Sequence, residues 1–211
     1  MLDLILESIS TIISNIIIFL IIPFIWWLIK YRKDTSFFKW LGLIKPKLNS
    51  RWWMIIIFII AYGFFYLFDF TMLMDGKSLE VMQTSETISV NVYTNLGVVA
   101  IIPALLKTFI ANGFCEEVFF RGFICKRLCN KFGKTVGVII QGIIFGGIHN
   151  MLYILGGVGL SLQSHIIVFI FTGMGGLLLG VLDEKVYNGS IIPSVFLHGL
   201  GNFISNLNVI F

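Results

Sequence analysis

Charged side chains are scarce in this chain. Asp, Glu, Lys and Arg make up 12% of its 211 residues and hydrophobic residues make up 57%, whereas about a quarter of a soluble domain is charged. A soluble globular fold is therefore excluded, and the chain is expected to lie in a lipid bilayer. The net charge of +4 is small and confined to a few loops, so we expect no nucleic-acid partner.

Cysteine is also rare, and the three cysteines, Cys115, Cys125 and Cys129, lie in one short segment. An odd number of cysteines, without a CxxC pair or zinc-finger histidines, argues against a disulfide scaffold and a structural zinc site. The first ten residues contain no Lys or Arg, although a cleavable signal peptide begins with basic residues. We therefore expect the first apolar run to be retained as a membrane helix.

Apolar runs of about 20 residues, the length that crosses a bilayer as a helix, are abundant. They predict spans at 4–29, 52–74, 92–112, 135–155, 163–182 and 190–211, with a shorter, partly polar helix at 114–130. The expected fold class is an all-α polytopic membrane protein, a bundle of about six to seven transmembrane helices. Pro103 could kink one long helix over 92–130, or Gly113 could divide it, and the sequence does not choose between them.

Basic residues gather in two connections, 30–51 and 122–134, and the second of these contains no acid. Loops rich in Lys and Arg stay in the cytoplasm, so the N-terminus is expected outside and both basic loops inside. The chain is thus predicted to be a multi-pass protein of a cell membrane. Its small size and Ile- and Asn-rich composition favour a bacterial plasma membrane. The lipid bilayer is its first expected partner, and the sequence gives no oligomeric state.

A few ionisable residues fall within the predicted spans of the second half, where charges are costly and usually functional. Glu117 and Arg121 are four residues apart, so they share a helical face and can form an ion pair. Glu116 is rotated by about 100° from Glu117 around a helix. It is therefore left outside the pair and free to titrate.

Helix pairing predicts which polar residues meet. Glu116 lies 15 residues before Lys131 and His149 lies 15 residues after Lys134, so antiparallel helices joined at the turn "NKFGK" place Glu116 and His149 at one depth. His198 shares a face of the last helix with the residue four positions later. A carboxylate, two imidazoles and a carboxamide can thus form an intramembrane polar site.

This set of groups suits hydrolysis. Glu116 can take a proton from water that His149 also holds. His198 and Asn202 can donate hydrogen bonds to a developing oxyanion. The sequence lacks HExxH, the usual zinc-protease motif.

Three motifs in this part of the chain resemble those of a known family. They are EExxxR at Glu116–Arg121, FxxxH at Phe145–His149 and HxxxN at His198–Asn202. In this order they resemble the CPBP intramembrane proteases, also called Abi or CAAX-protease-like, and the resemblance covers residues 110–205. It implies that the catalytic residues are Glu116, His149, His198 and Asn202, with Glu117 and Arg121 as supporting residues.

The resemblance implies an intramembrane endopeptidase that hydrolyses a peptide bond of a membrane-associated peptide or protein with a glutamate-activated water. Residues 91–211 would form the catalytic membrane domain, and residues 1–90 would form N-terminal transmembrane helices of unassigned role. No cofactor is expected. Zinc remains an alternative, because Glu116, His149 and His198 could supply three ligands; Asn202 favours the metal-free reaction, since an amide is a poor zinc ligand and a good oxyanion donor.

Two further functions stay open. Some relatives are associated with bacteriocin loci, so the chain could be a non-catalytic membrane protein that gives self-immunity to a bacteriocin. Acids and histidines inside a bundle also build ion or proton pathways. The clustering of the polar residues at one depth disfavours a pathway, which needs polar groups along its whole length.

Overall fold

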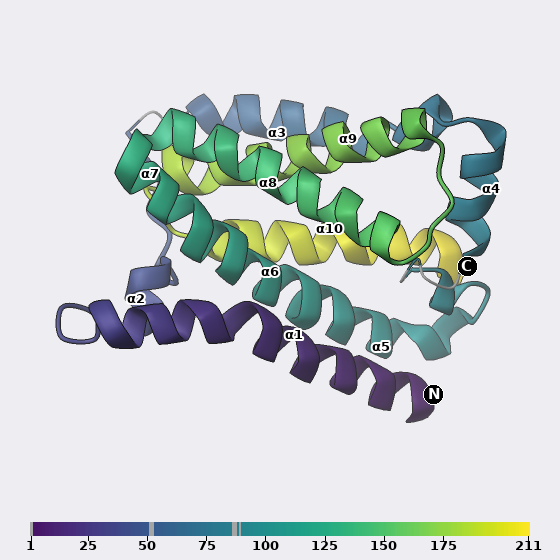
Figure 1. The fold of residues 1–211 in the computed structure, drawn as a ribbon, viewed down its shortest axis with the longest axis horizontal. Coiled ribbons are helices and arrows are strands. Elements are labelled where there is room, and N and C mark those ends of the chain that lie inside the picture. The colour runs from purple at the N-terminus through teal and green to yellow at the C-terminus, as the bar shows by residue number, and fades with distance from the viewer. Residues whose placement is uncertain (1, 51–52, 86–87, 89) are drawn as a thin grey trace.

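The structure, a computed structural model, describes residues 2–50, 53–85, 88 and 90–211. These residues form helices and turns and no strand, and the long helices run side by side along one direction (Figure 1). The principal helices are α1 (Leu2–Lys30), α3 (Trp53–Leu67), α8 (Lys134–Leu155), α9 (Leu162–Val181) and α10 (Ile192–Ile210). Short helices α2 (Phe37–Leu41) and α4 (Gly76–Thr84) lie at opposite ends of the bundle. The expected fold class, an all-α polytopic membrane protein, is confirmed.

Four helices of the described residues are long and apolar enough to cross a bilayer. They are Leu2–Lys30, Gly97–Phe132, Lys134–Leu155 and Leu162–Val186. Three of them match the predicted spans at 4–29, 135–155 and 163–182, the last with an extension at its C-terminal end. α10 follows the predicted run at 190–211 and has 19 residues.

The predicted span at 52–74 differs from the structure. Its first residue, Trp52, and the preceding Arg51 of the basic loop lie outside the described residues. α3 ends at Leu67 after 15 residues, which is about 22 Å at 1.5 Å per residue. A 3₁₀ turn, Phe70–Leu73, follows, and Asp69 caps it by accepting a hydrogen bond from the Thr71 amide. The polar cap ends the regular helix inside the apolar run.

The predicted helix over 92–130 is not divided at Gly113. One continuous helix runs from Gly97 to Phe132 over 36 residues, and we call it the long helix. It contains α5 (Ile101–Leu106), α6 (Cys115–Glu117) and α7 (Lys126–Phe132), joined by π-helical segments at Lys107–Phe114 and Val118–Cys125. At about 1.5 Å per residue this helix is longer than the roughly 30 Å hydrocarbon core, so it must tilt or extend beyond it.

Glycines let α10 approach the long helix. A Cβ atom on Gly113 would lie 2.9 Å from the carbonyl oxygen of Val195 and 3.0 Å from the Cα of Gly199. Backbone therefore meets backbone at this crossing, as small residues permit in membrane bundles. This crossing brings the middle of α10 beside the acidic pair of the long helix.

Glycines also join α8 to α9. A Cβ atom on Gly146 would overlap the carbonyl oxygen of Phe169 and lie 3.0 Å from the Cα of Gly173. One on Gly142 would lie 3.0 Å from the carbonyl oxygen of Gly173. Backbone therefore meets backbone at this crossing as well.

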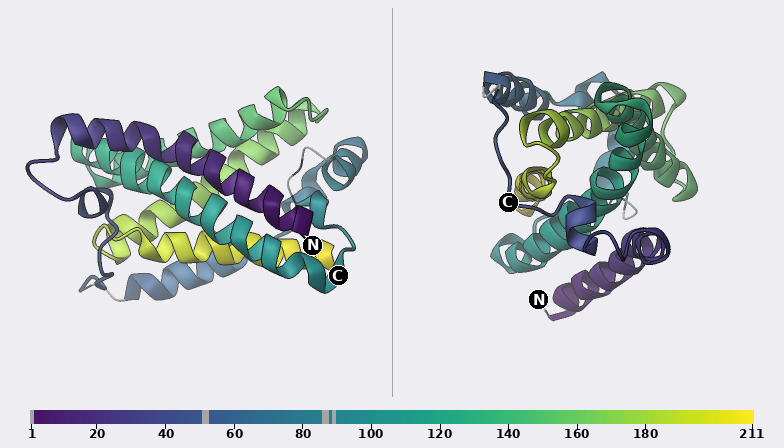
Figure 2. Two further views of the ribbon diagram at one scale, coloured as in Figure 1. Left: turned by 90° about the horizontal axis from the view of Figure 1, so that it is seen from below. Right: turned by 90° about the vertical axis from the view of Figure 1, so that its left-hand side faces the viewer.

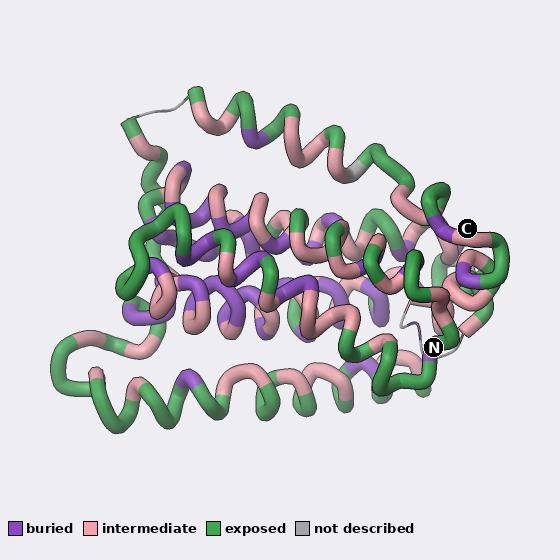
Figure 3. The backbone as a smooth tube through the Cα atoms, turned by 45° about the horizontal axis from the view of Figure 1, so that its top comes forward, coloured by how far each residue is buried: buried purple, intermediate pink, exposed green. Residues whose placement is uncertain are grey.

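Burial is concentrated in the central helices. Figure 3 shows the buried residues along the long helix, α8, α9 and α10, whereas α1 and α3 are mostly intermediate or exposed. α1 lies along the long helix (Figure 2), and Asn15 of α1 donates a hydrogen bond to the carbonyl oxygen of Ala111. From Ile16 to Ile29 the exposed residues of α1 are all apolar, as a lipid-facing helix requires.

A cluster of polar residues links α4 to the first turn of α9 at the end of the bundle where α4 lies (Figure 1). Asp75 caps α4 and accepts hydrogen bonds from the hydroxyls of Ser78, Ser161 and Ser164 and from the Ser78 amide. Ser161 itself caps α9. These hydrogen bonds, led by that from Ser161, hold the pKa of Asp75 below its usual range. The charged form of Asp75 is therefore the form that links α4 to α9.

We predict that Gly146→Ala destabilises the protein and Gly147→Ala does not. The added Cβ at Gly146 meets backbone, so overpacking should lower the free energy of unfolding by about 1–3 kcal/mol. At Gly147 its nearest neighbour would be the Phe169 ring at 3.9 Å, an ordinary contact. Thermal unfolding of both variants in the same detergent checks this, and equal stability of the two variants would contradict the packing described.

We predict that the stability contributed by Asp75 depends on pH. Because its pKa is lowered on folding, the contribution is complete at neutral pH and declines as the pH falls below the ordinary aspartate value of about 4. The difference in unfolding temperature between the wild type and Asp75→Asn should therefore shrink from pH 7 to pH 3. Asp34→Asn, in the exposed turn after α1, is the matched control and should show no such difference at either pH.

Candidate active site

Three helices bring together three of the residues that the sequence singled out. The long helix supplies Glu116, α8 supplies His149 and α10 supplies His198. The Oε2 atom of Glu116 lies 3.6 Å from Nε2 of His149 and 3.9 Å from Nε2 of His198. The three side chains are partly accessible, at 14%, 27% and 13% respectively, whereas the Oε2 atom of Glu116 itself is buried and makes no hydrogen bond to a residue that the structure describes.

Glu117 has a different environment from its neighbour Glu116. Its side chain is wholly buried, and its Oε1 atom lies 2.9 Å from Nη1 of Arg121 and 2.7 Å from Nδ1 of His198. Arg121 is 1% exposed and its guanidinium lies over the ring of Phe145 at 4.3 Å. The ion pair predicted from the four-residue spacing is therefore present. The pair is buried away from water. Breaking a buried pair is costly, because it leaves an uncompensated charge in the protein interior.

The hydrogen bonds of the two histidines define which ring nitrogens carry hydrogen. Nδ1 of His149 lies 2.9 Å from the carbonyl oxygen of Phe145, and a carbonyl only accepts, so Nδ1 donates. Nδ1 of His198 donates to the Glu117 carboxylate in the same way. In both neutral rings Nε2 is then the acceptor, and both Nε2 atoms face Glu116.

Phe145 packs the site from one side. Its ring lies 4.2 Å from the His149 ring and 4.8 Å, edge-on, from the ring of Phe120. Gly176 of α9 makes room for it, since a Cβ atom there would lie 3.0 Å from the Cβ of Phe145. The phenylalanine of the FxxxH motif thus positions both Arg121 and His149.

Asn202 lies one helical turn after His198, on the same face of α10, and is half-buried. Neither His165 nor Asn150 belongs to this cluster, because they pair with each other: Nδ1 of His165 lies 2.8 Å from Oδ1 of Asn150. The candidate site is therefore composed of residues from the long helix, α8 and α10.

Two polar residues near the site were missed by the sequence analysis. The predicted span at 163–182 left Asp183 outside the helix. In the structure the helix continues to Val186 through a π-helical segment, Leu182–Val186, and Asp183 is 1% exposed. Its Oδ2 atom accepts a hydrogen bond of 2.6 Å from the hydroxyl of buried Ser194. The available signal was two acids directly after an apolar run, without the basic excess of a cytoplasmic loop.

The zinc alternative would use Glu116 Oε2 and the Nε2 atoms of His149 and His198, the donor atoms that face one another. Within residues 2–50, 53–85, 88 and 90–211, no group of three or more His, Cys, Asp and Glu side chains is arranged to hold a metal ion.

Comparisons with known proteins place the chain in a family. The sequence model described as "Type II CAAX prenyl endopeptidase Rce1-like" matches residues 97–204, more than half of the chain. Neither the curated proteins nor the solved structures compared with it include a match. The matched region begins with the long helix and includes α8, α9 and most of α10, and so contains the whole candidate site. The chain belongs to the Rce1-like family of type II CAAX prenyl endopeptidases.

Proposed function

We propose that this protein is an intramembrane endopeptidase that hydrolyses a peptide bond of a membrane-associated peptide or protein. Glu116 is the general base that activates water. The observation that supports this most strongly is the position of Glu116 Oε2, which faces Nε2 of His149 at 3.6 Å and Nε2 of His198 at 3.9 Å. Membership of a family of CAAX-type endopeptidases supports the same class of reaction.

The separation between Glu116 and His149 suits a shared water molecule. It is longer than a hydrogen bond and short enough for one water to contact both atoms. Because Nε2 of neutral His149 accepts, the water donates one proton to His149 and the other to Glu116, and its lone pair is free to attack the peptide carbonyl carbon. Glu116 takes the proton as the C–O bond forms, and the same proton then goes to the leaving amine as the C–N bond breaks.

The negative oxygen that develops needs donors on its other side. Nδ1 of His198 is engaged with Glu117, so Nε2 donates only when the ring is protonated. The Glu117 carboxylate, 2.7 Å from Nδ1 of His198, is placed to be the counterion of such a ring, and it also pairs with Arg121. Asn202, on the same face of α10, supplies a second N–H donor.

We further propose that residues 91–211 form the catalytic domain and that residues 1–90 support it from the side. Contacts between α1 and the long helix favour this, among them the hydrogen bond of Asn15 and the packing of Phe19 on Phe119 with ring centroids 5.6 Å apart. The proposed location is a bacterial plasma membrane, with the basic loops in the cytoplasm.

We predict that Glu116→Gln lowers peptidase activity by about 100-fold or more, because a general base contributes about 10²–10⁴ to the rate. Membranes that contain the wild type should yield new peptide termini that are absent with Glu116→Gln. Glu80→Gln, an exposed acid on α4, is the matched control and should cleave like the wild type.

Full activity of Glu116→Gln would reject the endopeptidase assignment. If that variant also protected cells from a bacteriocin as well as the wild type does, the non-catalytic immunity function would replace it. The same assay after chelation tests the zinc alternative: the glutamate-activated water predicts unchanged cleavage, whereas loss of cleavage that added zinc restores would establish a metal enzyme.

We also predict that Arg121→Gln destabilises the protein by about 3 kcal/mol or more, because it leaves the buried Glu117 charge without its guanidinium. Lys131→Gln removes the same charge from an exposed position of α7 and should change stability little. Chemical unfolding in detergent measures both variants. Equal stability of the two would show that Arg121 does not hold Glu117 in its charged form.

A further inference from the structure

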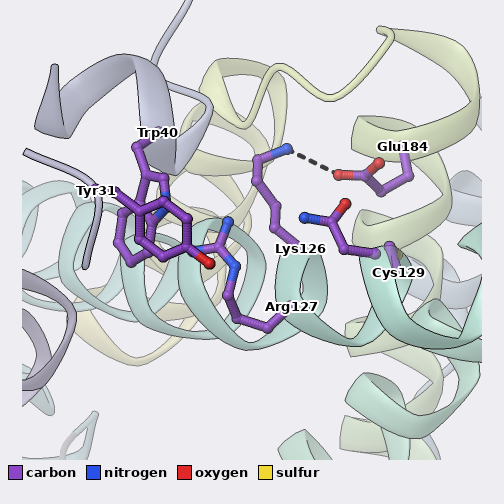
Figure 4. Close-up of a pocket in the computed structure, with 7 residues that line it drawn as sticks. Tyr31, Trp40, Lys126, Arg127, Cys129 and Glu184 are labelled. Atoms are coloured by element: carbon purple, nitrogen blue, oxygen red, sulfur yellow. Dashed lines mark hydrogen bonds and ion pairs between the residues drawn. The ribbon is translucent and has the colours of Figure 1, made fainter. Parts of the chain in front are cut away.

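A second polar feature lies at the end of the bundle that carries the basic loops. A cavity of about 280 Å³ opens between the residues that follow α1, helix α2, helix α7 and the end of the α9 helix. Tyr31, Trp40, Lys126, Arg127 and Glu184 are among its lining residues (Figure 4). It lies on the long helix about ten residues beyond Glu116, and the catalytic proposal does not use it.

Arg127 is the central group of this cavity. Its guanidinium lies over the indole of Trp40 at 4.0 Å, and the ring of Tyr31 packs against the same indole with centroids 5.5 Å apart. Its Nη1 atom is buried and makes no hydrogen bond to any residue that the structure describes. A buried donor of this kind is costly unless a ligand or water satisfies it.

The charges around Arg127 are unbalanced. Lys126 Nζ lies 2.8 Å from Oε1 of Glu184, and Lys134 Nζ lies 3.7 Å from Oε2 of the same carboxylate. One acid therefore serves two lysines, and Arg127 adds a third cation. A planar guanidinium held by stacking is suited to two parallel hydrogen bonds to a phosphate.

The position of the cavity favours a lipid phosphate. Trp and Tyr side chains occupy the headgroup level of membranes, and this end of the bundle is predicted to be cytoplasmic, where anionic lipids gather. On the last turns of α1, which lead to Tyr31 of the cavity, Trp26 and Ile29 are 43% and 73% exposed, so acyl chains can lie against this part of α1. We propose that this cavity binds the phosphate of an anionic phospholipid, with Arg127 as the principal ligand and Lys126 beside it.

A lipid bound in this cavity would also link two parts of the chain. α2 packs on the long helix where a Cβ atom on Gly122 would lie 2.9 Å from the carbonyl oxygen of Leu41. Because Arg127 of α7 is stacked on Trp40 of α2, a phosphate bound to Arg127 would hold this stack in place and so fasten the first basic loop to the long helix. Binding should therefore raise the unfolding temperature of the whole protein.

The test uses the full chain in neutral detergent, with short-chain phosphatidylglycerol, phosphatidylcholine or inorganic phosphate added. Native mass spectrometry should detect phosphatidylglycerol bound to the wild type, and the unfolding temperature should rise with it. Arg127→Gln should bind this lipid about tenfold more weakly or worse, since it loses a charge-assisted hydrogen bond. Lys131→Gln, which removes an exposed cation from the same helix, should bind like the wild type.

Equal binding of phosphatidylglycerol by Arg127→Gln and the wild type would overturn the proposal, as would equal binding of phosphatidylcholine by the wild type. Stabilisation by inorganic phosphate that matches that of phosphatidylglycerol would reassign the cavity to a soluble phosphate. If Arg127→Gln does not fold, Arg127→Lys is the deciding variant, because a lysine keeps the charge but not the paired hydrogen bonds. Arg127→Lys should bind phosphatidylglycerol more weakly than the wild type does. Undiminished binding by this variant would also overturn the proposal.

Discussion

The arrangement of Glu117, Arg121 and His198 is the constraint on which the rest of this bundle depends. A carboxylate that is wholly buried in a membrane protein needs charged and hydrogen-bonding partners, and it obtains one from its own helix and one from α10. That requirement fixes how close the two helices must be. The glycines at 113 and 199 meet it by letting the backbones touch.

Once Glu117 is fixed, its neighbour is fixed as well. Glu116 belongs to the same short α-helical segment, Cys115–Glu117, with a π-helical segment on either side. π-Helical turns are rare and frequently occur at functional sites. Here they flank the two adjacent acids: Glu117 contacts a guanidinium and the Nδ1 atom of one imidazole, whereas Glu116 faces the Nε2 atoms of two imidazoles. The difference in surroundings gives two identical side chains different chemistry.

The same helix connects the two polar sites of the molecule. Glu116 lies near its middle and Arg127 near its C-terminal end, so a phosphate bound at the membrane surface would act on the helix that carries the proposed catalytic base. Large apolar side chains are exposed on α1 and α3. Among the buried polar side chains, Lys107, Thr108, Glu117 and Arg121 belong to the long helix.

Much of the fold followed from local sequence. Apolar runs located α1, α8, α9 and α10 to within a few residues, because a helix in a bilayer needs length and apolarity alone. The errors occurred where polar caps or π-helical segments decided the outcome. Asp69 ended α3 early, and the helix after 163 continued past 182 to bury Asp183 against Ser194. Neither event has a periodic signal, since each depends on a partner distant in space or on a single hydrogen bond.

For the site, the sequence by itself determined the membrane class, the three motifs and the pairing of residues four apart, because 3.6 residues per turn is a local rule. Only the tertiary structure decided that His198 bonds to Glu117 and not to Glu116, which nitrogen of each imidazole faces the acid, and that Arg127 lies on Trp40 beside a cavity. These contacts join different helices. Their distances are set by glycine crossings and by the depth at which each helix lies, which no periodicity within one helix records.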